Sequence, residues 1–157
     1  MRSMTKRIAY TKVVPSAYRA LFALEGAVRS TGIDAKLKDL VYMRVSQING
    51  CAFCLDMHDR ELRELGETNE RLALLSVFRE VPQLFNPRER AALAWAEAVT
   101  KLGPRGVSDE VYALASAEFG EKELVDLTLA VIAINAWNRM NCAFRTEPGL
   151  TRHSTEK

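Results

Sequence analysis

The sequence has no apolar run long enough to cross a membrane. Its most apolar segment, LTLAVIAINAW at 127–137, has eleven residues, whereas a membrane-spanning helix needs roughly 20. The N-terminal segment MRSMTKRIAYTKVV is basic, but no apolar stretch of the kind found in signal peptides follows it. We therefore expect a cytoplasmic protein with no membrane partner.

An excess of one charge sign is also missing. The 22 basic and 20 acidic residues leave a net charge of +2, and the two signs alternate in segments such as DRELREL. Proteins that bind nucleic acid usually carry a basic stripe that contacts phosphates, and none is visible here. The alternating charges are typical of solvated helix faces, so we expect no nucleic-acid partner.

Strand signals are nearly absent. The sequence has no sustained two-residue alternation and no hairpin dipeptide between β-branched runs, whereas helical spacing and helix-capping residues recur along it. Helices are expected over 15–30, 35–48, 51–65, 69–81, 87–102, 109–119 and 121–140. The sequence thus predicts an all-α fold, a compact bundle of about seven helices in a single domain over residues 1–157. We expect an N-terminal arm over 1–14 and a frayed tail over 149–157.

Cysteine is scarce as well, and three cysteines are too few and too unevenly placed for a secreted disulfide framework. Two of them lie in SQINGCAFCLDMH at 46–58, where Cys51, Cys54 and His58 are spaced three and then four residues apart. At 100° per residue, from about 3.6 residues per turn, the three side chains fall within roughly 60° of one another. They are expected to meet in a crevice at the start of a helix.

Several physical effects act on these two thiols. Cys51 lies at the expected helix N-terminus, where unpaired backbone N–H groups favour a thiolate. His58 follows Cys54 by one turn and is within reach to take its proton or pair with its anion, while apolar surroundings oppose ionisation. Cysteines at i and i+3 have Cα atoms within the bridging range of roughly 4.4–6.8 Å. The spacing therefore suits a reversible dithiol.

Redox catalysis by the cysteine pair is the interpretation we favour, and two others stay open. The thiols and the histidine could be buried structural residues. They could also supply three ligands to zinc, although Cys142 and His153, which would have to complete the set, are distant in the sequence. A c-type haem is excluded because Leu55, not histidine, follows the second cysteine.

The string INGCAFCLDMH at 48–58, with the helix before it, resembles the core of the AhpD-like alkylhydroperoxidases of the carboxymuconolactone decarboxylase superfamily. The similarity is strong over 37–66 and continues more loosely through PRERAALAWAEAV and ELVDLTLAVIAINAWNRM. It implies an AhpD-like all-α fold, homo-oligomers that are often trimers or hexamers, and reduction of peroxides without metal or flavin. Because no reductase domain is visible in the sequence, an external dithiol protein would have to restore the thiols.

The resemblance also implies roles for individual residues. Cys54 would be the peroxidatic thiolate, Cys51 the proton donor and resolving thiol, and His58 the base and orienter. The pairing with His58 favours Cys54 as the attacking thiol, whereas the helix-terminus argument favours Cys51. The family uses a glutamate twelve residues before the first cysteine, and this chain has the shorter Asp39 there. Asp39 is either part of that relay or an exposed acid near a helix N-terminus.

Two other functions are compatible with this fold. A decarboxylase-like lyase would not require a cysteine pair, and a non-catalytic redox sensor would become oxidised without turnover. Among the remaining residues, Arg44 lies on an apolar stripe and needs an acidic partner or a subunit boundary. Tyr42 is expected to be a packed aromatic that approaches the cysteine crevice. Cys142 is expected to be a packing thiol or a spare reactive one.

Overall fold

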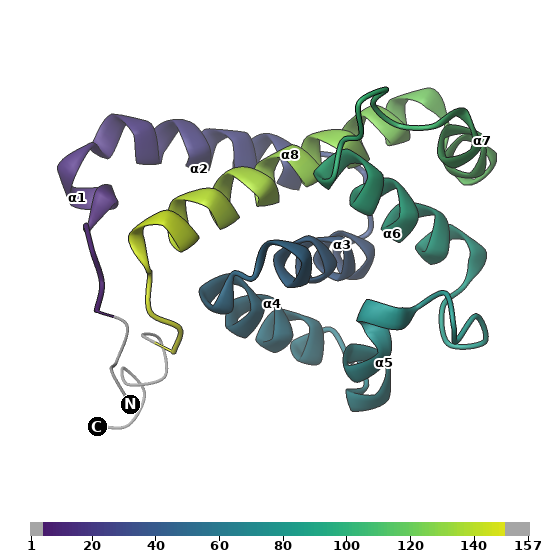
Figure 1. Cartoon of the computed structure of the whole chain (residues 1–157), viewed down its shortest axis with the longest axis horizontal. Helices are drawn as coiled ribbons and strands as arrows, with labels where there is room; N and C mark the ends of the chain where they lie inside the picture. The colour runs from purple at the N-terminus through teal and green to yellow at the C-terminus, as the bar shows by residue number, and fades with distance from the viewer. Residues whose placement is uncertain (1–4, 150–157) are drawn as a thin grey trace.

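The computed structural model describes residues 5–149, and over this range the fold is helical. Apart from an isolated bridge between Gly103 and Gly106, these residues form no strand. In chain order the helices are α1 (Tyr10–Val13), α2 (Pro15–Arg29), α3 (Ala35–Asn49), α4 (Ala52–Glu64), α5 (Asn69–Leu74), the 3₁₀ helix η1 (Leu75–Val77), α6 (Pro87–Thr100), α7 (Asp109–Glu118) and α8 (Glu121–Phe144) (Figure 1). The predicted all-α bundle is confirmed.

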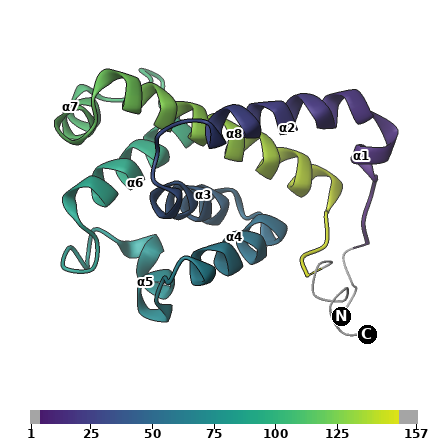
Figure 2. The ribbon, with the colours of Figure 1, turned by 180° about the vertical axis from the view of Figure 1, so that it is seen from behind.

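Helix α3 lies at the centre of the molecule. It packs against α4, α6 and α8, and both views place it between α8 and α4 with α6 alongside (Figures 1 and 2). Eight of its residues are buried, and they are distributed around the helix instead of along one stripe. The neighbours on several sides therefore fix the position and rotation of α3.

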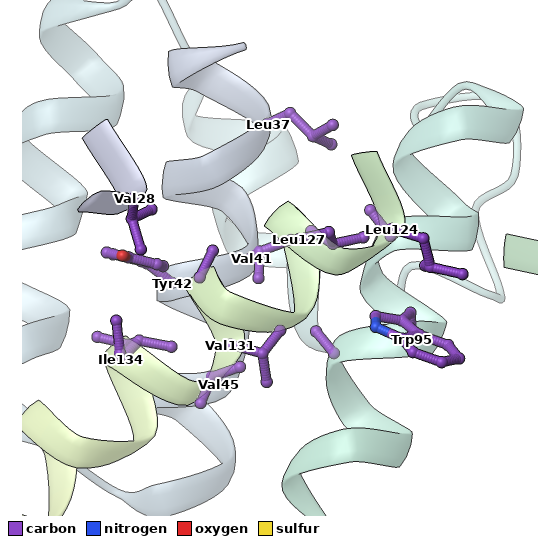
Figure 3. Close-up of a cluster of buried hydrophobic side chains, with 14 of the residues drawn as sticks. Val28, Leu37, Val41, Tyr42, Val45, Trp95, Leu124, Leu127, Val131 and Ile134 are labelled. Atoms are coloured by element: carbon purple, nitrogen blue, oxygen red, sulfur yellow. The ribbon is translucent and has the colours of Figure 1, made fainter. Parts of the chain in front are cut away.

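Two clusters of buried side chains meet at this central helix. Val41 and Val45 of α3 belong to the larger cluster, which they share with residues of α2, α6 and α8 (Figure 3). Leu40 and Met43 belong to a second cluster with residues of α4, α5, η1 and α6. Because fully burying one such side chain stabilises a fold by roughly 1.5–3 kcal/mol, α3 is held firmly from both sides.

Helix α2 is attached more lightly. It runs beside α8 at the edge of the bundle (Figures 1 and 2) and packs mainly against it. Of its 15 residues only Glu25 and Val28 are buried. One of the two is a carboxylate, so α2 contributes little apolar area to the core.

The structure differs from the predicted helices at three places. A short helix, α1, forms within the expected N-terminal arm, and α8 continues to Phe144. The helix expected over 69–81 ends at Leu74 and tightens into η1, because the closer 3₁₀ spacing of i and i+3 directs both Leu75 and Phe78 into the core. The predicted frayed tail lies almost entirely outside the described residues; Gly149, which is described, donates its N–H to Asp56 Oδ2 at 3.1 Å.

The acidic partner expected for Arg44 is Glu97 of α6. Arg44 Nη2 lies 2.6 Å from Glu97 Oε1, and both side chains are largely buried. Arg79 Nη1 binds the second oxygen of Glu97 at 2.6 Å. The pairing joins α3 to α6 within one chain, so Arg44 needs no subunit boundary. No helix between residues 5 and 149 is both long and apolar enough to span a membrane.

Candidate active site

The cysteine pair lies where the chain passes from α3 to α4. Gly50 ends α3 with φ 66° and ψ 35°, a left-handed conformation that favours glycine. The turn lets the Cys51 N–H donate to Ser46 O at 3.0 Å. Cys51 is the N-cap of α4, and its Sγ accepts the Cys54 N–H at 3.4 Å. The two Cα atoms are 5.3 Å apart, and the sulfurs are joined as a disulfide. The predicted position at a helix start is confirmed.

The turn at Gly50 predicts a measurable cost of substitution. A Cβ added there would meet nothing within 4 Å, so the loss in Gly50→Ala comes from the positive φ alone. We expect about 1 kcal/mol of lost unfolding free energy, measured by chemical denaturation. Gly32→Ala is the matched control, because that site is equally open and its φ is not positive. Equal losses in the two variants would contradict a role for the left-handed turn.

His58 lies one turn into α4 beyond Cys54 and is almost fully buried. Its Nδ1 is 2.8 Å from Glu61 Oε2 and 3.8 Å from Asp39 Oδ1, while its ring meets the Tyr42 ring edge-on at 5.1 Å between centroids. Two carboxylates on one side assign the proton to Nδ1. Nε2 is then the acceptor nitrogen, and it has no hydrogen-bond partner among the described residues.

Asp39 is only 4% exposed, so its interpretation as an exposed acid near a helix terminus is wrong. It lies on α3, which other helices cover on several sides. Burial raises the pKa of Asp39, against the opposing charges of Lys38 and His58. The hydrogen bond from His58 lowers the pKa of Glu61. One carboxyl group with a raised pKa and one with a lowered pKa therefore lie at the same side of one imidazole. This arrangement is suited to storing and moving a proton.

The same three side chains bear on the question of a metal. Ligand atoms of Asp39, His58 and Glu61 lie within 4.8 Å of one another, and no cysteine belongs to this group. Lys38 Nζ lies 3.2 Å from Asp39 Oδ1, and its charge opposes the entry of a cation. The residues thus fit a proton relay better than a zinc site.

Replacing Asp39 by asparagine is expected to stabilise the fold increasingly as pH rises. Because the folded-state pKa of Asp39 is raised, its contribution to stability is fully present below the ordinary value of 3.8. That contribution is lost as pH rises through the folded value, whereas asparagine does not titrate. The Tm of Asp39→Asn relative to wild type should therefore increase from acidic to neutral pH. Asp109→Asn, at an exposed site, is the control, and a pH-independent difference for Asp39→Asn would contradict the prediction.

A cavity of about 420 Å³ opens beside these residues. Cys54 and His58 both line it, whereas Cys51 does not. Asn141 of α8, another lining residue, directs its Nδ2 to Cys54 Sγ at 3.7 Å. The cavity thus lies against the second cysteine of the pair and the histidine, both of which are buried.

The lining also includes a buried carboxylate that the sequence did not point to. Glu25 of α2 accepts a hydrogen bond from the Tyr42 hydroxyl at 2.9 Å and one from Arg29 Nε at 3.4 Å. Burial, reinforced by Glu25, raises the pKa of Tyr42, which therefore stays a neutral donor. Tyr42 is packed in the core, as expected, and also joins the cavity wall.

Glu61 and Asn141 were also missed from sequence. A signal existed for Glu61, which follows His58 by three residues on one helix face; no sequence signal connects Asn141 to Cys54, 87 residues away. Cys142 is exposed, and its Sγ lies 3.8 Å from Asn49 O. Partial desolvation raises the pKa of its thiol, and its exposure argues against the packing thiol that was one of the two expectations. His153 lies outside the described residues.

The family model of the carboxymuconolactone decarboxylase family matches residues 15–98, which include Cys51, Cys54, His58 and Asp39. The chain belongs to the carboxymuconolactone decarboxylase family. Within the family it is similar to the uncharacterized protein YdfG of Bacillus subtilis (strain 168), with 35% identity over 140 residues that cover 89% of this chain and 95% of YdfG.

Solved structures place this member of the family among its AhpD-like proteins. A protein of unknown function from Agrobacterium tumefaciens, proposed to be an antioxidant defence protein AhpD, is 41% identical with a TM-score of 0.89, over 93% of this chain and 99% of that one. An alkylhydroperoxidase AhpD core from Ralstonia eutropha JMP134 shares the fold at 21% identity, with a TM-score of 0.75 over 90% and 75% of the two chains. The resemblance seen in the sequence is confirmed at the level of family and fold.

Proposed function

We propose that this protein is a dithiol peroxidase that reduces organic hydroperoxides through Cys51 and Cys54. The observation that carries the proposal is the position of Cys54. It lies at disulfide distance from Cys51 and, unlike Cys51, on the wall of a cavity that His58 also lines. Attacking thiol, base and substrate space are thus together, and the resolving thiol lies next to them.

In the first step His58 Nε2 takes the proton of the Cys54 thiol, and the thiolate attacks the peroxide. A sulfur–oxygen bond forms and the O–O bond breaks, which leaves a sulfenic acid on Cys54 and an alkoxide. The proton held by His58 passes to the alkoxide to give an alcohol. Glu61 and Asp39 stabilise the imidazolium that exists between these transfers, because both face its Nδ1.

In the second step the Cys51 thiol attacks the sulfenic sulfur. The Cys51–Cys54 disulfide forms, the sulfur–oxygen bond breaks, and water leaves. An external dithiol protein then reduces the disulfide by exchange and becomes a disulfide itself. We infer a cytoplasmic location, where such reductants are maintained, and a homo-oligomer, a trimer or hexamer, as the family resemblance implies.

Its place in the cavity lining and its hydrogen bonding support Cys54 over Cys51 as the attacking thiol. The Asn141 amide donates to Cys54 Sγ at 3.7 Å, an interaction that favours the anion. Cys51 has the N-cap position, but its sulfur does not line the cavity.

The test is peptide mass mapping of the reduced protein after one equivalent of an organic hydroperoxide. We expect a rapid Cys51–Cys54 disulfide in the wild type and a trapped sulfenic acid on Cys54 in Cys51→Ser. Repeated turnover with added dithiol would distinguish an enzyme from a sensor that is oxidised once. Thiols that remain unmodified would overturn the proposal in favour of a lyase or a structural role.

A further inference from the structure

The cavity beside Cys54 gathers an unusual share of the aromatic residues. The chain has twelve phenylalanine, tyrosine and tryptophan residues, and six of them line this single space. They come from five different helices. These are Tyr10, Tyr18, Phe22, Tyr42, Phe53 and Trp137.

Three of these rings form a connected wall. Tyr18 lies 5.8 Å from Phe22 along α2 and 5.9 Å from Trp137 of α8, the latter in an edge-on arrangement. Helices α2 and α8 run side by side, so the wall spans their junction (Figure 1). Phe22 is 56% exposed, and Tyr18 and Trp137 are partly exposed. Ring surface therefore remains free to contact a ligand.

Tyr42 also lines the cavity, next to His58. Its ring packs in the core, its hydroxyl is bound to Glu25, and its edge meets His58. Tyr42 is only 2% exposed, so the aromatic surface that a ligand would contact is that of the Tyr18–Trp137 wall, in the cavity that the proposed reacting sulfur and base also line. Aromatic rings prefer offset or edge-on contacts with other rings.

The cavity is much larger than the smallest peroxides. A molecule the size of water takes roughly 30 Å³ in the liquid, whereas this cavity measures about 420 Å³. Its volume is in the range of sites that enclose small organic ligands, roughly 300–1,000 Å³. Hydrogen peroxide would leave most of the aromatic surface uncovered.

We propose, on the basis of the peroxidase function above, that the substrate is a hydroperoxide whose organic group carries an aromatic ring. The ring packs against the Tyr18–Trp137 wall of the cavity, and the hydroperoxide group is directed towards Cys54. The selectivity arises from burial of the ring, because the reacting O–O bond is the same in ring-bearing and ring-free hydroperoxides.

Cumene hydroperoxide and tert-butyl hydroperoxide provide a matched pair of probes. Both are tertiary hydroperoxides, and they differ by a phenyl group in place of a methyl group. The kcat/KM for cumene hydroperoxide is divided by that for tert-butyl hydroperoxide, and the result is divided by the same ratio of their rates with free dithiothreitol. We expect this corrected ratio to be roughly 10 to 100. The ratio is independent of the amount of active protein.

Variants of the wall test where the selectivity originates. Trp137→Leu should lower the ratio towards the dithiothreitol baseline, and Phe22→Leu, at an exposed site that does not threaten folding, should lower it in the same direction. Tyr112→Leu is the control, since Tyr112 is an exposed aromatic away from the cavity and the ratio should keep its wild-type value.

The outcomes separate this inference from the function on which it rests. If both hydroperoxides form the Cys51–Cys54 disulfide but the wild-type ratio equals the baseline, the aromatic substrate class is wrong and the peroxidase stands. The same conclusion follows if the ratio is high but neither wall variant changes it. If neither hydroperoxide oxidises the pair, the peroxidase function itself is overturned.

Discussion

Replacing Cys54 by serine is expected to lower peroxide turnover on the order of 10³-fold or more. The serine hydroxyl is not ionised by a neighbouring imidazole to a useful extent, and it cannot form the disulfide that completes the cycle. Steady-state consumption of an organic hydroperoxide with added dithiol measures the loss. Because serine is nearly isosteric with cysteine, the change at this fully buried site should leave the fold intact, as circular dichroism would verify.

The other two cysteines provide the controls for this result. Without added dithiol, Cys51→Ser should consume about one equivalent of peroxide in a first rapid phase, because Cys54 still attacks but its sulfenic acid has no resolving thiol beside it to condense with. Cys142→Ser should turn over at the wild-type rate, since its exposed thiol is outside the cavity lining. Full turnover by Cys54→Ser, or a first phase lost in Cys51→Ser and kept in Cys54→Ser, would reverse the assignment of the two thiols.

Replacing His58 by glutamine is expected to slow the first oxidation of Cys54 by roughly 10²- to 10⁴-fold near neutral pH, the usual contribution of a general base. The reason is that Nε2 is the acceptor nitrogen without a hydrogen-bond partner among the described residues, on a side chain that lines the cavity, and glutamine provides no basic atom there. The deficit should shrink towards pH 9, because an unassisted thiol ionises near pH 8.5. Stopped-flow mixing of reduced protein with one equivalent of peroxide measures this step alone.

A second variant tests the positioning of the imidazole. Glu61→Gln removes the charge 2.8 Å from His58 Nδ1 and should reduce the rate by a smaller factor, about 10-fold. Glu64→Gln, an exposed acid on the same helix, should have no effect. If the deficit of His58→Gln were independent of pH, His58 would be a structural residue and the general-base assignment would fail.

The fold was predictable because its signals are local. Asp34 caps α3 by accepting the Leu37 N–H at 2.9 Å, and Asn86 with Glu89 forms the capping box at the start of α6. Such contacts connect residues three positions apart, so the sequence displays both partners. The break of the fourth predicted helix, expected over 69–81, into η1 depends on tertiary burial of Leu75 and Phe78, which no local pattern records.

The candidate site was predictable in part for the same reason. The spacing of Cys51, Cys54 and His58 within one helix placed them on one face without any knowledge of the fold. Asp39 was ambiguous because a helical wheel assumes one buried face, whereas α3 is covered on several sides. Glu25 could not be found, since it and Tyr42 are 17 residues apart on different helices, and only tertiary packing brings them into hydrogen-bond contact.

The light attachment of α2 has a consequence for access to the buried cysteines. Cys51 and Cys54 are 1% and 0% exposed, so a protein reductant can reach their sulfurs only when a covering element moves. Helix α2 buries two of its 15 residues, whereas α3 buries eight, and local unfolding begins where the least apolar area is buried. Amide hydrogens of α2 should therefore exchange with solvent through low-energy partial openings, and those of α3 only when the whole molecule unfolds. Because Tyr18 and Phe22 of α2 line the cavity beside Cys54, opening of α2 would then let the reductant reach the disulfide.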